Sequence, residues 1–169
     1  ELAKNKTLRD LESNGDKYLL MNDSDKLLKY SPKYNAILQK INELTKTSGE
    51  SLGTAFVYTE YKTLEGIAVF SKILNANGYA PFRLGKNDLG EYVQEFKDDS
   101  EMAKPKYAFW GGDEQESDII RKIYNNDFEE LPKSLADQFK SSKQNNLRGD
   151  IIKILMTTKS GAEGIDLHN

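Results

Sequence analysis

Cysteine is absent from the 169 residues, and histidine occurs once, at His168. Without cysteine the chain can form no disulfide, use no catalytic thiol and bind no zinc through sulfur. A single imidazole leaves almost nothing for histidine-based acid–base or metal chemistry. The usual hydrolase triads and histidine-rich metal centres are therefore excluded, and we expect no metal site within this chain.

Long apolar runs and an excess of basic charge are also missing. No stretch approaches the roughly 18 to 20 apolar residues that a membrane-spanning helix needs, so no membrane partner is expected. The net charge of −3 and the isoelectric point near 5.4 argue against a dedicated high-affinity nucleic-acid binder, which is normally strongly basic. The same charge permits nucleic-acid contacts made by loops and backbone amides.

The length and the 37% hydrophobic content fit one domain with a single core. The N-terminus shows neither an initiator methionine nor a signal peptide, so we expect an intracellular protein of which this sequence begins mid-chain. Residues 1–30 are polar apart from the short apolar patch Tyr18–Met21, and we interpret them as a linker or arm. Residues 31–169 are expected to form the domain.

A helix is predicted to begin at Ser31-Pro32, because serine is a good N-cap and proline suits the first helical position. Gly49 is predicted to follow the end of this helix. Apolar residues recur on one face of the helix and are expected to be buried: Tyr34, Ile37, Leu38, Ile41 and Leu44.

Strands and helices alternate after this helix. Four short apolar runs predict strands at 54–58, 81–84, 106–110 and 151–157, the first of them buried on both faces. Helical spacing predicts helices around 64–74 and 119–124, and a small helix around 92–96. This alternation is typical of a single α/β domain in which a parallel sheet carries helices on both faces.

Functional residues of open α/β sheets sit in loops at the carboxyl ends of the strands. The loop 157–167 follows the most apolar strand, and its hydroxyls and two glycines allow backbone amides to approach a phosphate or a ribose. An ordinary glycine-containing turn, with Asp166 as a helix N-cap, explains the same residues. Tyr58, Tyr61 and Trp110 are candidates for stacking on bases or, alternatively, for packing in the core.

The run from Ile154 to Leu167 resembles motif V of superfamily 2 helicases and translocases, in which the string T-K-A/S-G-x-E-G-I-N/D-L is usual. The sequence of this run most resembles the Swi/Snf-like branch and large DNA virus helicases of the nucleoside-triphosphate phosphohydrolase type. The polar insertions at 85–104 and 127–149 depart from the common pattern of these proteins.

Three further landmarks of this superfamily occur upstream in the expected order. They are the S-P-K-x helix start at 31–34, a motif IV-like strand at 55–59, and a strand with a G-D turn at 107–113 that is followed by Arg121 and Phe128. The resemblance implies that residues 31–169 form the second RecA-like (P-loop NTPase-type) lobe, truncated after motif V. Residues 1–30 would then be the linker or arm between two lobes.

The resemblance also implies an activity for the full-length parent, which would couple ATP hydrolysis with Mg²⁺ to movement on DNA or RNA. Its partners would be the nucleic acid and the N-terminal RecA-like lobe of the same parent. A viral parent would place it in the virion or in a viral factory. The alternative from a different class is a non-catalytic RecA-like or flavodoxin-like module that binds a nucleotide or a protein.

Residue roles follow from the resemblance alone. Thr158, Ser160 and Gly161 would face the nucleic-acid backbone, with Gly112 and Thr59 as further candidates for such contacts. Gly164 and Asp166 would approach the ATP ribose or the catalytic water when the lobes close. A hydroxyl and backbone amides at a strand end suit a phosphate without requiring net positive charge.

No P-loop, G-x-x-x-x-G-K-[ST], is present. The run Gly49–Thr54 resembles a P-loop in its glycines and hydroxyl residues but contains no lysine. Asp113-Glu114 mimics a magnesium-binding box, but fits the G-D turn of a second lobe better. The arginine of motif VI would lie beyond Asn169. We therefore expect no cofactor bound to this chain alone and no ATPase activity from it.

Overall fold

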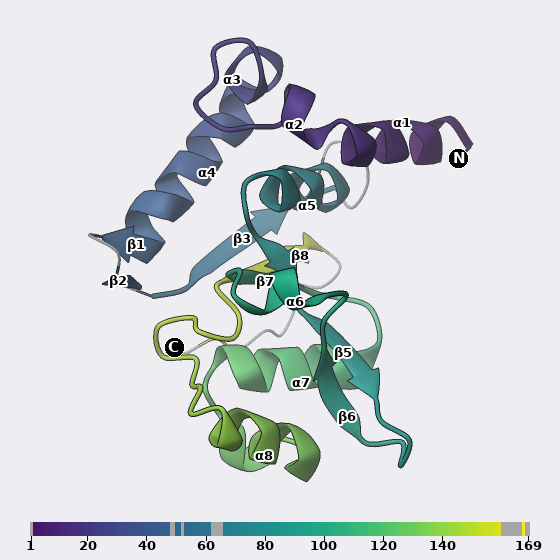
Figure 1. Ribbon diagram of the computed structural model, residues 1–169, viewed down its shortest axis with the longest axis vertical. Helices are drawn as coiled ribbons and strands as arrows, with labels where there is room; N and C mark the ends of the chain where they lie inside the picture. Colours follow the sequence, from purple (N-terminus) through teal and green to yellow (C-terminus); the bar gives the residue numbers. More distant parts are fainter. Residues whose placement is uncertain (1, 48–49, 52, 62–65, 160–166, 168–169) are drawn as a thin grey trace.

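The computed structural model describes residues 2–47, 50–51, 53–61, 66–159 and 167. Figure 1 shows two helical layers separated by a small central sheet. In chain order the elements are α1 (Leu2–Ser13), α2 (Gly15–Tyr18), α3 (Leu27–Tyr30), α4 (Pro32–Thr45), β1 (Lys46–Thr47), β2 (Glu50–Ser51), β3 (Ala55–Thr59), α5 (Ile67–Ala76), β4 (Ala80–Pro81), β5 (Arg83–Lys86), β6 (Tyr92–Glu95), α6 (Asp99–Met102), β7 (Lys106–Trp110), α7 (Glu114–Tyr124), the 3-10 helix η1 (Phe128–Glu130), α8 (Lys133–Ser141) and β8 (Ile154–Thr158).

The central sheet has four strands in the order β3-β8-β7-β4, and every pair in it is parallel. Helices α4 and α5 cover one face, and α7 and α8 cover the other (Figure 1). This confirms the α/β class and the parallel sheet between helices, an arrangement consistent with a single RecA-like domain. No helix in the described part of the chain is long and apolar enough to cross a membrane.

Strand β8 lies between β3 and β7 and is buried at all five residues. Its side chains alternate between the faces, so Ile154 and Met156 join the cluster formed by α4 and α5, while Leu155 joins the cluster formed by α7 and α8. The apolar run that predicted a strand at 151–157 is therefore the centre of the fold, although the ladder itself begins at Ile154.

The side chain of Asn146 fixes how the chain enters β8. It is completely buried, and its amide nitrogen donates to the carbonyl oxygen of Tyr124 at 3.1 Å. Its carbonyl oxygen accepts the backbone N–H groups of Ile151 at 3.1 Å and Ile152 at 2.8 Å. These bonds satisfy buried backbone groups that precede the strand and have no ladder partner of their own.

The helix predicted at Ser31-Pro32 is α4, and the N–H of Tyr34 donates to the Ser31 hydroxyl at 3.4 Å, which confirms the cap. Leu38 and Ile41 are buried as expected. Leu44 is exposed, contrary to the prediction, because it lies in the last turn of α4, which runs past the sheet toward the β1–β2 hairpin (Figure 1).

The prediction that strand 54–58 is buried on both faces is wrong. Phe56 and Tyr58 are 44% and 48% exposed, whereas Ala55 and Val57 pack against the α4–α5 cluster. The reason is the strand order: β3 is an end strand, and α7 packs on β7 at a distance from it. One face of β3 is therefore left open by the described residues.

The region 81–96 also differs from expectation. Only Ala80–Pro81 pairs with β7; the chain then leaves the sheet, and 83–86 pairs antiparallel with 92–95. The small helix predicted around 92–96 is thus a strand, β6. The tight turn before it explains this outcome, because Gly90 has a φ of +76° and the Asn87 side chain accepts two backbone N–H groups within the turn.

The segment 2–30, interpreted above as part of a linker or arm, contains the helices α1, α2 and α3. Within the apolar patch, Leu19 is buried in the α4–α5 cluster, as is Leu27 further on. The Asn77 side chain donates to the Leu19 carbonyl and accepts the Met21 N–H, both at 2.8 Å, which holds the segment against the end of α5. A role between two lobes stays a prediction.

Replacing Asn146 with alanine is expected to lower the free energy of unfolding by about 3 kcal/mol, since it removes the acceptor of two buried N–H groups, those of Ile151 and Ile152. Urea denaturation followed by circular dichroism measures this loss. Asn145→Ala is the matched control, because that side chain is exposed and accepts only the N–H of Leu147. Equal midpoints for the two variants would contradict this role of Asn146.

The carboxylate of Glu101 is expected to make stability depend on acid pH. Its pKa lies below the usual value of 4.5, mainly because the Arg83 guanidinium donates a hydrogen bond to it, helped by the Lys97 N–H at 2.9 Å. A depressed folded-state pKa gives stability that is present above the unfolded pKa and lost as the pH falls through the folded one.

We expect Glu101→Gln to lose about 1 kcal/mol of stability near neutral pH, and this difference to shrink as the pH falls through the lowered folded-state pKa of Glu101. Denaturation curves across this pH range provide the measurement. Asp99→Asn, an exposed change in the same short helix, serves as the control. A constant difference between Glu101→Gln and the native chain at all pH values would show that the charge is irrelevant.

Candidate functional site

The parallel sheet brings the carboxyl ends of β3, β8 and β7 to one edge. Thr59 and Thr158 are directly paired residues of β3 and β8, and Trp110 pairs with Thr157 on the other side of β8. Gly112 follows two residues after the end of β7. Thr59, Thr158 and Gly112, which were separate candidates in the sequence, are thus all placed at the edge where ligands of such sheets bind.

The two paired threonines differ in accessibility. Thr158 is only 4% exposed, whereas Thr59 is partly exposed and its hydroxyl accepts the N–H of Tyr61 at 3.3 Å. The hydroxyl of Thr157 donates inward, to the Trp110 carbonyl at 2.8 Å. Thr59 is therefore the more accessible hydroxyl of the pair. The other candidates, Ser160, Gly161, Gly164 and Asp166, lie outside the described residues.

The turn after β7 has the geometry of a helix cap. Gly111 adopts a φ of +130°, and the side chain of Asp113 accepts the N–H of Glu116 at 3.0 Å as the N-cap of α7. Asp113 is thus the N-cap of α7, and the G-D turn of a second lobe stays a prediction. The described residues contain no cluster of three or more acidic or histidine side chains that suits a metal.

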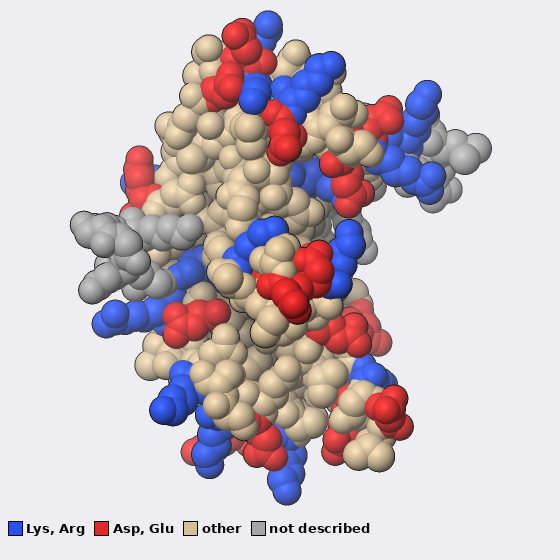
Figure 2. All heavy atoms as spheres, in the orientation of Figure 1, with Lys and Arg blue, Asp and Glu red and all other residues tan. Residues whose placement is uncertain are grey.

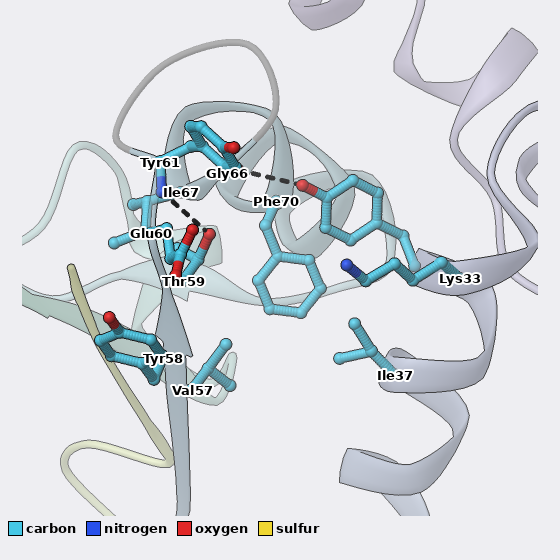
Figure 3. A pocket seen from close by; sticks show the side chains of 11 residues that line it. Lys33, Ile37, Val57, Tyr58, Thr59, Glu60, Tyr61, Gly66, Ile67 and Phe70 are labelled. Carbon is cyan, nitrogen blue, oxygen red and sulfur yellow. Dashed lines mark hydrogen bonds between the residues drawn. The ribbon is translucent and has the colours of Figure 1, made fainter. Parts of the chain in front are cut away.

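A pocket of about 470 Å³ opens beside Thr59, between the first turns of α4 and α5. Figure 3 shows Lys33, Ile37 and Phe70 converging from these helices on a space next to Val57 of β3. The pocket is lined by Lys33, Tyr34, Ile37, Val57, Tyr58, Thr59, Glu60, Tyr61, Gly66, Ile67 and Phe70. The sequence did not predict this pocket, since its walls come from segments that meet only in the fold.

Gly66 closes the back of this pocket by a tight backbone contact. The N–H of Ile67 donates to the Tyr61 carbonyl at 3.2 Å, and the Tyr34 hydroxyl donates to the Gly66 carbonyl at 3.4 Å (Figure 3). A β-carbon at Gly66 would lie 1.6 Å from the Tyr61 carbonyl oxygen. Tyr34 also stacks on Phe70, with ring centroids 5.5 Å apart, so α4 and α5 are joined at the pocket wall.

The three aromatic candidates have different surroundings. Tyr61 is 54% exposed at the pocket rim, and Tyr58 is 48% exposed on the open face of β3, so neither is a core residue. Trp110 is partly buried and packs against the α7–α8 cluster. Exposure therefore favours stacking for the two tyrosines, and core packing accounts for Trp110.

Charge on the visible surface is mixed. Figure 2 shows Lys and Arg side chains interspersed with Asp and Glu over the whole face, without a broad basic patch. This distribution agrees with the net charge of −3. A nucleic-acid contact on this face would accordingly rest on local groups such as hydroxyls, amides and single lysines.

Comparison with known proteins gives one informative similarity. The chain is 25% identical over 142 residues to the "Putative ATP-dependent RNA helicase" of Acanthamoeba polyphaga mimivirus. The match covers 83% of this chain but 18% of that protein, so the chain spans less than a fifth of its relative's length. No protein-family model and no solved structure matches the chain. The similarity supports a helicase relationship and does not extend to a particular lobe or motif.

Gly66→Ala is expected to lower the free energy of unfolding by about 2 kcal/mol, because the new methyl group overlaps a backbone carbonyl that cannot rotate away. Thermal unfolding of the two purified proteins measures the effect. Gly53→Ala is the matched control, since a β-carbon there meets no atom within 4 Å. A melting temperature of Gly66→Ala equal to that of the control would show that the contact with Tyr61 is not maintained in solution.

Proposed function

We propose that this chain is the second motor lobe of an ATP-dependent superfamily 2 helicase or translocase that moves on DNA or RNA. The observation that supports it best is the pairing of Thr59 with Thr158 at the carboxyl edge of the sheet, because Thr158 lies within the segment Ile154–Leu167 that resembles motif V. The helicase named among its relatives points in the same direction. Residues 1–30 would then be the arm that joins the two lobes.

In this proposal the carboxyl edge of the sheet lies along the backbone of one nucleic-acid strand. The hydroxyls of Thr59 and Thr158 and the amides near Gly112, Ser160 and Gly161 contact successive phosphates. Because these groups are neutral, the contact needs no basic surface and suits a mildly acidic lobe. Base identity plays no part in such contacts, which is the property that a motor moving along any sequence requires.

ATP and Mg²⁺ do not fit this chain alone. The chain has no P-loop lysine, and its described residues contain no acidic cluster for a metal. In the proposal the N-terminal lobe of the parent holds the nucleotide, while Gly164 and Asp166 complete the cleft from this side. We expect the isolated chain to show no ATPase activity. The proposal also includes an intracellular location, or a virion or viral factory where the parent is viral.

The test uses a parent protein that contains both lobes. Thr59→Val and Thr158→Val should each weaken single-strand binding several-fold, equivalent to about 1 kcal/mol, because one hydroxyl contact to a phosphate is lost. Asp166→Ala should leave strand affinity unchanged and lower strand-stimulated ATP turnover, because it acts only when the lobes close. Fluorescence anisotropy with DNA and RNA oligonucleotides and a phosphate-release assay give the two readouts.

Thr54→Val is the control for these threonines, since it removes a hydroxyl just before the opposite, amino end of β3. Equal losses of melting temperature in Thr158→Val and Asp166→Ala, without a change in affinity or turnover, would mean that the loop 157–167 stabilises the fold and takes no part in binding or turnover. A parent without strand-stimulated ATPase would favour the alternative, a non-catalytic α/β binding module.

A further inference from the structure

The pocket beside Thr59 has no part in the backbone contacts proposed above. We propose that it receives one unstacked base of the bound single strand, with a preference for bases that carry an exocyclic amino group. This inference rests on the proposed function, because it assumes that a strand passes over Thr59. It adds a base-binding site to an interface whose other contacts are to the backbone.

The shape and the lining of the pocket suit a flat heterocycle. Its volume of about 470 Å³ is in the range of small-molecule sites and exceeds what a single base requires. Ile37, Val57 and Ile67 supply apolar side chains from three different elements. A base has two apolar faces and a polar edge, so it can bury its faces here while its edge points to the rim.

An exposed ring stands where a base would enter. Tyr61 is 54% exposed and lines the opening, whereas the ring of Tyr58, which is 48% exposed, points to the other face of β3 (Figure 3). Bases displaced from a strand commonly stack on such side chains, because every base presents a π-face. Tyr61 also follows Thr59 by only two residues, so a phosphate at the Thr59 hydroxyl leaves the attached base within reach of its ring.

Two charged side chains of opposite sign complete the rim. Lys33 and Glu60 both line the pocket and are exposed, and neither forms an ion pair within the described part of the chain. The ammonium group of Lys33 suits a phosphate of the same nucleotide. The carboxylate of Glu60 can only accept hydrogen bonds, so it suits an amino group on the base edge and disfavours a carbonyl.

Cytosine and uracil test this chemistry as a matched pair, because they differ at C4 by an amino group against a carbonyl oxygen. Cytidine monophosphate and uridine monophosphate are titrated into the ¹⁵N-labelled 169-residue chain. We expect the amide signals of Thr59, Gly66 and Ile67 to shift, with cytidine monophosphate binding about fivefold more tightly, as one additional hydrogen bond implies. Glu60→Ala should remove the preference and keep the binding.

Ile37→Trp fills the pocket from within and should abolish these shifts for both nucleotides. Lys40→Ala is its control on the same helix, an exposed lysine outside the pocket, and should bind as the native chain does. Pocket amides that do not move, or that move equally in Ile37→Trp, overturn the proposal. Equal affinity for the two nucleotides overturns the role of Glu60 and with it the preference.

A second experiment distinguishes the two possible ligands of the pocket, a base within a nucleic-acid strand and a free nucleotide. Oligonucleotides of about eight cytidines or uridines are titrated into the same proteins. Binding that Thr59→Val weakens and Ile37→Trp leaves unchanged would overturn the pocket and keep the proposed function. Nucleotides that shift the pocket amides while neither oligonucleotide binds would exclude a strand as the source and reject the proposed function. Oligonucleotide binding weakened several-fold by both variants supports the proposal.

Discussion

Burial of β8 between β3 and β7 is the constraint on which the rest of this structure depends. All five of its residues are buried, and they supply side chains to both helical layers. The strand comes last in the described sequence and lies in the middle of the sheet. The sheet is therefore incomplete until this segment has inserted, and such pairing between remote segments is entropically demanding.

The candidate site is a product of the same insertion. Thr59 and Thr158 belong to segments about a hundred residues apart, and only the β3–β8 register places them side by side. Lys153 secures that register, since its carbonyl accepts the Ala55 N–H, its own N–H donates to the Lys106 carbonyl, and its ammonium group donates to the Gly53 carbonyl at 2.8 Å. Core stability and site geometry are consequently coupled.

The sequence predicted what depends on local pattern. The cap at Ser31 and the apolar runs of β3, β7 and β8 were recognisable because each has its own composition. Strand order is a tertiary property, so the exposure of Phe56 and Tyr58 could not be seen. The hairpin at 83–95 was missed because its few apolar residues fit the spacing of a helix as well as that of a strand. The pocket was missed because α4, β3 and α5 approach one another only in three dimensions, and the expected roles of 160–166 remain predictions.

The position of β3 at the end of the sheet has a consequence for handling this protein. One side of its backbone has no strand partner among the described residues, and the five residues Ala55–Thr59 contain neither a charge nor a proline. Lysines and prolines at such edges are what normally prevents strands of different molecules from joining. Among the described residues the edge of β3 carries none of these guards, and this favours edge-to-edge association of the chain in concentrated solution.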